Sequence, residues 1–220
     1  MKNIRWIHRA DTLTVADMNA LLTAAAGLMT GAALIIAIGP QNVLVLRTGV
    51  ARRHVVSVLA VCTVSDLILI TAGVAGLGAL VSGHPMLITV ATLVGGGYVI
   101  VLGLLAARRS LAPSAMTITS GGIGGRWATI GTALALTWLN PHVYIDTVLT
   151  LGAIANSHGP EGKWPFAIGA GIASIIWFAA LALAAVKLAP LFARPRAWRI
   201  LDAVVAVIMV TIGASLIISV

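Results

Sequence analysis

The chain has 220 residues, of which 60% are apolar and only 9% are charged. A soluble domain carries about 25% charged residues, so this composition excludes a soluble enzyme, a disordered tail and a disulfide scaffold, and it indicates an integral membrane protein. The net charge of +8 comes from 14 lysines and arginines in short clusters between apolar runs. Membrane topology produces that distribution, so no nucleic-acid partner is expected. The single cysteine, Cys62, excludes a disulfide framework.

Residues 1–17 are more polar than the rest, with three basic and two acidic side chains. We interpret them as an N-terminal tail or as the result of a start codon placed too early, because Met18 opens the first apolar run directly. A helix needs about 20 apolar residues to cross a bilayer. By this criterion the sequence predicts six transmembrane segments, at residues 18–46, 55–81, 85–107, 127–155, 164–186 and 200–220.

A Ser/Thr/Gly-rich stretch at residues 110–125 has no hydrophobic period and is predicted to be a central loop. It separates a first half, residues 18–109, from a second half, residues 126–220. Three spans in each half make the halves insert in opposite directions, so we expect an all-α membrane protein of two inverted three-helix halves. If the first run does not cross fully, five spans remain.

Basic residues define the expected orientation. They gather in loops one, three and five, at residues 47–54, 108–126 and 187–199, while the turn at 82–85 and the loop at 156–163 hold one lysine between them. Loops one, three and five are therefore predicted to be cytoplasmic in the plasma (inner) membrane, with the C-terminus outside. Six spans would also place the N-terminus outside, where its basic residues fit poorly.

Asp66 lies near the middle of the second predicted span. A carboxylate at that depth costs roughly 2.5 to 3.5 kcal/mol on insertion scales, so such residues are usually paired or functional. We interpret Asp66 as a substrate-binding residue. The alternative is a protonated side chain that bonds a neighbouring helix.

Two helix breaks lie inside apolar spans, at Gly39-Pro40 in the first and at Asn140-Pro141 in the fourth. Proline removes a backbone donor, and lipid cannot satisfy the polar groups that a break exposes. Broken helices at matching positions of two halves are typical of the binding site in inverted-repeat transporters. Gln41, Asn42 and Asn140 are therefore predicted to bind substrate. Two ordinary proline kinks are the alternative.

Other polar residues in the spans are weaker candidates. Asp146 lies one helical turn beyond His142, so the two side chains are expected to face each other, and Asp146 is included in the predicted site. His142, Ser65 and Trp177 are further candidates for which packing is an equal explanation. Asp202, near the cytoplasmic end of the last span, is interpreted as an interfacial ion pair with Arg199.

The sequence lacks the motifs of several metal sites and enzyme active sites. The histidines lack zinc-site spacing, and no nucleophile elbow or phosphate-binding loop is present, so we expect no metal, no cofactor and no enzymatic activity. Small residues at helical spacing suit either close helix packing or a homodimer interface. These are Gly27 with Gly31, Gly169 with Ala173, and residues 95–97.

The sequence resembles the LysE/ArgO-type exporters of basic amino acids within the LysE/RhtB group. The likeness covers residues 18–220, and the family's members usually begin near the position of Met18. The stretches that carry it are Ile38-Gly-Pro-Gln-Asn-Val-Leu-Val-Leu-Arg47, Val61-Cys-Thr-Val-Ser-Asp-Leu67, residues 72–76, Thr137-Trp-Leu-Asn-Pro-His-Val-Tyr-Ile-Asp-Thr147, Ala173-Ser-Ile-Ile-Trp-Phe178 and Arg196-Ala-Trp-Arg-Ile-Leu-Asp202.

The resemblance implies export of L-lysine, L-arginine or related solutes from the cytoplasm, driven by the membrane potential or a proton gradient. Asp66 or Asp146 would pair with a substrate cation, and a broken-helix N-terminus would face its carboxylate. The alternative function is export of a neutral amino acid or of another small cation.

Overall fold

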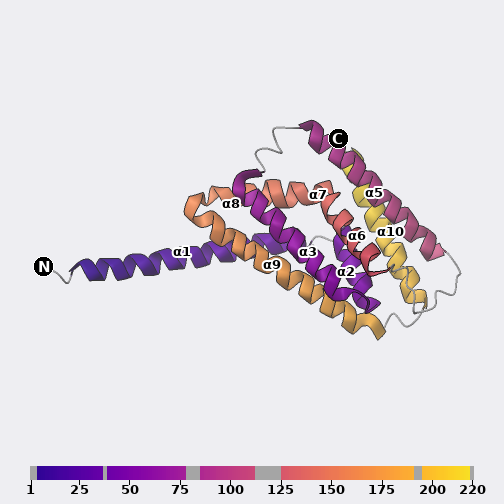
Figure 1. Ribbon diagram of the computed structural model, residues 1–220, viewed down its shortest axis with the longest axis horizontal. Coiled ribbons are helices and arrows are strands. Elements are labelled where there is room, and N and C mark those ends of the chain that lie inside the picture. The colour runs from indigo at the N-terminus through magenta and orange to yellow at the C-terminus, as the bar shows by residue number, and fades with distance from the viewer. Residues whose placement is uncertain (1–3, 37–38, 78–84, 112–124, 191–194, 219–220) are drawn as a thin grey trace.

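The computed structural model describes residues 4–36, 39–77, 85–111, 125–190 and 195–218, which are almost entirely helical and include no strand (Figure 1). Most of the predicted central loop and residues 82–84 of the predicted turn lie outside these residues. The elements are α1 (Ile4–Ile35), α2 (Pro40–Val50), α3 (Val55–Ala72), the π-helix η1 (Gly73–Leu77), α5 (Pro85–Leu111), α6 (Arg126–Trp138), α7 (Pro141–Val143), the π-helix η2 (Tyr144–Leu151), α8 (Gly152–Ser157), α9 (Gly159–Leu188) and α10 (Pro195–Ile218).

Five helices among the described residues are long and apolar enough to cross a membrane, which confirms the predicted all-α membrane fold. The predicted span at 127–155 is not one of them, because the second break divides it into the 13-residue α6 and shorter pieces. The division of the chain into two inverted halves stays a prediction. The five helices cover Val15–Ile35, Val55–Leu77, Thr92–Leu111, Gly159–Leu188 and Arg196–Ile218.

The first helix extends beyond the other helices. α1 is 32 residues long and begins at Ile4, and its N-terminal part projects from the rest of the protein in Figure 1. Residues 4–17, which we interpreted as a tail, are therefore continuous with the first membrane-spanning helix. Farther along, α1 packs against α9.

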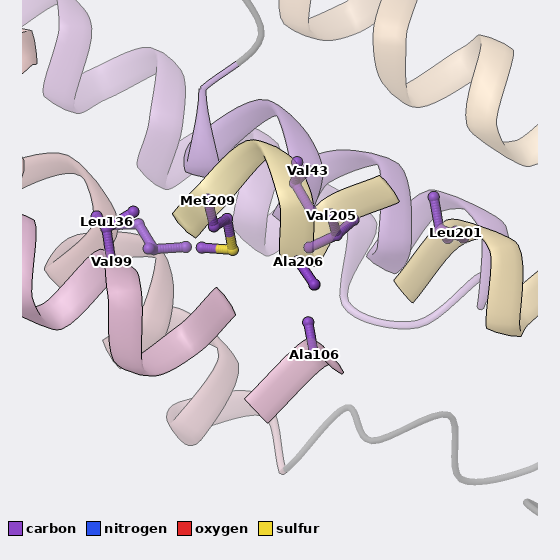
Figure 2. Close-up of a cluster of buried hydrophobic side chains, with 8 residues drawn as sticks. All are labelled: Val43, Val99, Ala106, Leu136, Leu201, Val205, Ala206 and Met209. Atoms are coloured by element: carbon purple, nitrogen blue, oxygen red, sulfur yellow. The ribbon is translucent and has the colours of Figure 1, made fainter. Parts of the chain in front are cut away.

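The pair α5 and α10 packs side by side and forms one wall of the protein (Figure 1). Buried apolar side chains fill the seam between them, and α2 and α6 each contribute one residue to the same cluster (Figure 2). The helices that follow the first break and precede the second break are thereby anchored on one support. The cluster consists of Val43, Val99, Ala106, Leu136, Leu201, Val205, Ala206 and Met209.

Small residues are used for close packing within the chain. A side-chain carbon at Gly27 of α1 would collide with the Phe166 carbonyl group of α9, and one at Gly31 would lie 2.9 Å from the Ala170 Cα atom. The Gly27/Gly31 spacing thus serves the contact between α1 and α9. A homodimer is not needed to explain it.

Gly95 lets α5 approach the second break. A Cβ atom at this position would collide with the Leu139 carbonyl oxygen and lie 2.5 Å from Pro141 Cδ. We expect Gly95→Ala to lower the free energy of unfolding by about 1 to 3 kcal/mol, as overpacking usually does. Thermal unfolding of purified protein in detergent measures the change.

Gly97, two residues farther along α5, is the matched control, because a Cβ atom there would meet no atom of the described part of the chain within 4 Å. Gly97→Ala is expected to be neutral or to stabilise the helix by up to about 1 kcal/mol through helix propensity. Equal unfolding temperatures for the two variants would contradict the close approach at Gly95.

Candidate functional site

A cavity of about 320 Å³ is lined by residues of both helix breaks. All five residues predicted to bind substrate line it: Gln41, Asn42, Asp66, Asn140 and Asp146. Gly39, Pro40 and His142 also line it, and its other lining residues are Leu34, Ile35, Val143, Thr147, Phe178 and Ile212. The structure therefore brings residues from distant parts of the sequence to one place.

At the first break, α1 ends at Ile35 and α2 begins at Pro40. The last carbonyl groups of a helix have no intrahelical partner. Asn42 Nδ2 donates to the Ile35 carbonyl oxygen at 3.1 Å, which satisfies one of these groups. The amide of Asn42 is itself held by α9, because Trp177 Nε1 donates to Asn42 Oδ1 at 3.3 Å. The candidate Trp177 thus contacts a cavity residue without lining the cavity itself.

The second break is stabilised in a similar way. Asn140 Oδ1 accepts a hydrogen bond from the His142 backbone N–H at 3.1 Å, which caps the start of α7. The Tyr144 hydroxyl donates to the Trp138 carbonyl oxygen at 2.8 Å. Trp138 Nε1 in turn donates to Ser65 Oγ at 3.1 Å, so this candidate residue supports the break and does not line the cavity. Pro141 is buried and does not line it either.

The two carboxylates of the cavity differ in their surroundings. Asp66 on α3 is 6% exposed and lies beside Gln41, and its Oδ2 atom accepts a hydrogen bond from Ser174 Oγ of α9 at 3.0 Å. Asp146 on η2 is partly exposed, and its Oδ2 atom lies 2.9 Å from His142 Nδ1. No lysine or arginine is among the lining residues that the structure describes. The cavity therefore offers negative charge to a positively charged ligand.

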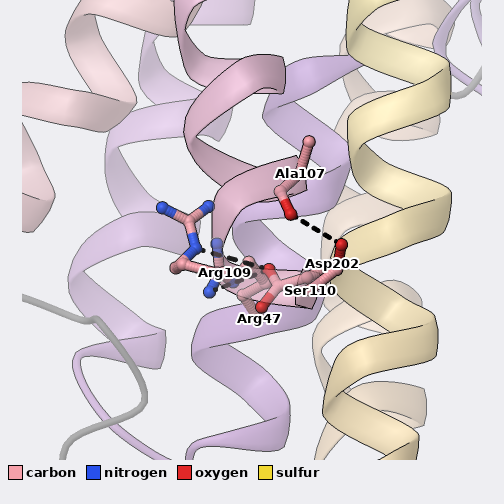
Figure 3. Close-up of polar contacts among 5 residues, drawn as sticks. All are labelled: Arg47, Ala107, Arg109, Ser110 and Asp202. Carbon is pink, nitrogen blue, oxygen red and sulfur yellow. Dashed lines mark hydrogen bonds and ion pairs between the residues drawn. The ribbon is translucent and has the colours of Figure 1, made fainter. Parts of the chain in front are cut away.

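Asp202 lies outside this cavity and has different partners from the one we expected. Its Oδ1 atom is 3.2 Å from Arg47 Nη2 and 3.5 Å from Arg109 Nε, so it joins α10 to α2 and α5 (Figure 3). Arg199 is exposed and forms no ion pair with the described residues. The predicted ion pair of Asp202 is therefore present, but its partners are Arg47 and Arg109 and not Arg199, because neighbours in sequence cannot reveal arginines contributed by other helices.

Some residues at the site were not predicted from the sequence. Ser174, which donates to Asp66 across helices, is one of them, and its signal in the sequence is that of a polar residue in an apolar span. Phe178 and Ile212 line the cavity as apolar residues of apolar helices, and no pattern separates them from their neighbours. Thr147, next to Asp146, could have been inferred only from the π-helical geometry of η2.

A multi-pass helical membrane protein with two helix breaks around an acidic cavity has the architecture of a solute transporter. The profile of the LysE type translocator family matches residues 32–220, and this chain belongs to that family. The resemblance identified from the motifs is thereby confirmed.

Similar proteins include one described as a candidate amino-acid transporter of Mycobacterium tuberculosis (strain ATCC 25618 / H37Rv). It is 44% identical over 178 residues, which cover 81% of this chain and 88% of the relative. A relative in Mycobacterium bovis has the same identity and coverage. The lysine exporter LysE of Corynebacterium diphtheriae is 36% identical over 223 aligned positions, covering 88% of this chain and 98% of that protein. No solved structure matches significantly.

Proposed function

We propose that this protein exports basic amino acids, L-lysine or L-arginine, from the cytoplasm by secondary transport. The observation that supports the proposal best is the pair of carboxylates, Asp66 and Asp146, in one cavity that no described lysine or arginine lines. A lysine or arginine zwitterion carries two positive groups, and a buried positive group needs a compensating charge. The similarity to a protein named as a lysine exporter supports the same substrate class.

Export of a neutral amino acid is the second candidate. Asp146 already has His142 as a partner at 2.9 Å, which leaves Asp66 as the acid without a basic partner among the described residues of the cavity. A single carboxylate would suffice for the α-ammonium group of a neutral substrate.

Counterflow into proteoliposomes that contain the purified protein separates these candidates. We expect labelled L-lysine or L-arginine to accumulate when the vesicles are preloaded with the same unlabelled amino acid. Imposing a membrane potential or a pH difference then identifies the driving force. Accumulation of L-homoserine alone would support the neutral candidate, and no counterflow of any of the three would contradict amino-acid transport.

We also propose that loops one, three and five face the cytoplasm. The test begins with replacement of Cys62, which is fully buried, followed by single cysteines at Ser82, Ser114 and Ser157 and an impermeant thiol reagent on intact cells. Ser157, exposed at the end of α8, and Ser82 are expected to react, while Ser114 in loop three is not. Ser82 and Ser114 lie outside the described residues. Labelling of Ser114 alone would reverse the orientation.

A further inference from the structure

The two helix breaks present different N-termini to the cavity. At the second break, α7 has three residues and Asn140 already caps it. At the first break, α2 has 11 residues, its N-cap is Gly39, and none of the described side chains caps it. An uncapped helix start leaves backbone N–H donors and the positive end of the helix dipole available to a neighbouring group. Of the two breaks, the first is therefore the one equipped to bind an anion.

The side chain of Gln41, the second residue of α2, provides a further hydrogen-bond donor at the start of this helix. It is 8% exposed and lines the cavity, and its buried Nε2 atom lies beside the Asp66 carboxylate without forming a hydrogen bond of normal geometry to any described residue. A buried donor without an acceptor is unfavourable, so an oxygen atom of a ligand is expected here. Space is also available, because a Cβ atom built on Gly39 would meet no described residue within 4 Å.

We infer that the N-terminus of α2 and Gln41 Nε2 bind the α-carboxylate of the transported amino acid, an assignment that rests on the proposed function. The α-ammonium group then lies next to Asp66, because Gln41 is beside Asp66 and both charged groups of an α-amino acid are attached to one carbon. Asp66 keeps acceptor capacity beyond its bond from Ser174. The substrate side chain extends into the rest of the cavity, which holds Asp146 and His142.

Calorimetry on the purified full chain tests the assignment with L-lysine, L-arginine and L-homoserine, each measured beside its carboxamide. The carboxamide keeps the ammonium groups and the size of the amino acid but removes the negative charge. We expect the protein to bind the amino acid about 10-fold to 150-fold more tightly than the carboxamide, the range for hydrogen bonds to a charged group. Gln41→Met, which keeps the bulk of the side chain, should reduce this preference through weaker binding of the amino acid alone.

Gly39→Asp provides a second variant that should fold well. The backbone of Gly39 is extended, with φ −104° and ψ 171°, as the N-cap position requires, and aspartate is a favourable N-cap residue. Its carboxylate would occupy the donors of α2 and should abolish the preference for the amino acid. Gly39→Ala adds a methyl group without charge and should keep the preference.

The outcomes distinguish the assignment from the function on which it rests. The carboxylate subsite would be overturned if the protein bound the amino acid and its carboxamide equally. It would also be overturned if Gln41→Met and Gly39→Asp both kept the preference for the amino acid over the carboxamide. Either result would leave the proposed function standing. Failure of all three amino acids to bind would overturn both.

Discussion

Asp66→Asn is expected to reduce transport by about 100-fold or more while leaving the amount of protein in the membrane unchanged. The substitution is nearly isosteric, and asparagine can still accept the hydrogen bond from Ser174. It removes the charge that would compensate a substrate cation, and hydrogen bonds to charged groups contribute about 1.5 to 3 kcal/mol each. Membrane insertion should not suffer, because a buried carboxylate is itself costly in the bilayer.

Counterflow at matched protein density measures this effect. Asp17→Asn is the control, since Asp17 is an exposed residue of α1 away from the cavity and its loss should leave transport normal. Normal transport by the Asp66 variant would instead mean that this carboxylate has a structural role, bonding α3 to α9 through Ser174.

The second large effect is expected for Asp202→Asn, on stability. Asp202 is the shared counterion of Arg47 and Arg109, and its side chain is only 5% exposed. Removal of one partner from a buried ion pair typically costs about 3 to 5 kcal/mol, because the remaining charge stays buried. Partial exposure of Arg109 places the expected loss toward the lower end of this range. Thermal unfolding in detergent, followed by size-exclusion chromatography, measures it.

Arg199→Gln is the matched control for this cluster, because Arg199 is the partner that the sequence favoured for Asp202. As an exposed residue without an ion pair to the described residues, it should change the free energy of unfolding by less than about 0.5 kcal/mol. A loss for Arg199→Gln as large as that for Asp202→Asn would favour the pair predicted from sequence over the observed one.

The helical segments could be predicted from the sequence, because a membrane-spanning helix needs a long apolar run and because glycine and proline mark the places where such a run is interrupted. New helices begin at Pro40 and at Pro141, as expected from a residue that lacks a backbone donor and suits the first turn of a helix. The run at 127–155 was predicted to carry a break at Asn140-Pro141, and the structure has separate helices on the two sides of it.

For the candidate site, the sequence allowed prediction of the polar residues but not of the contacts between them. Asp66 and Asn140 attract notice because polar groups are costly in lipid, whatever their neighbours. That Trp177 bonds Asn42 and that Ser174 bonds Asp66 depends on how α9 packs against α2 and α3, which no spacing along the chain encodes. The same limit explains why Asp202 was assigned to a neighbour in sequence.

Ser174 and Trp177 are three residues apart on α9, so their side chains lie on the same face of one continuous helix. One holds Asp66 of α3 and the other holds Asn42 of α2. If α9 moved relative to these helices, both hydrogen bonds would be strained at once. A ligand that draws Asp66 or Asn42 away from α9 would therefore change the free energy of that movement. Occupancy of the cavity and the position of α9 are thus linked equilibria, in which each biases the other by the same coupling free energy.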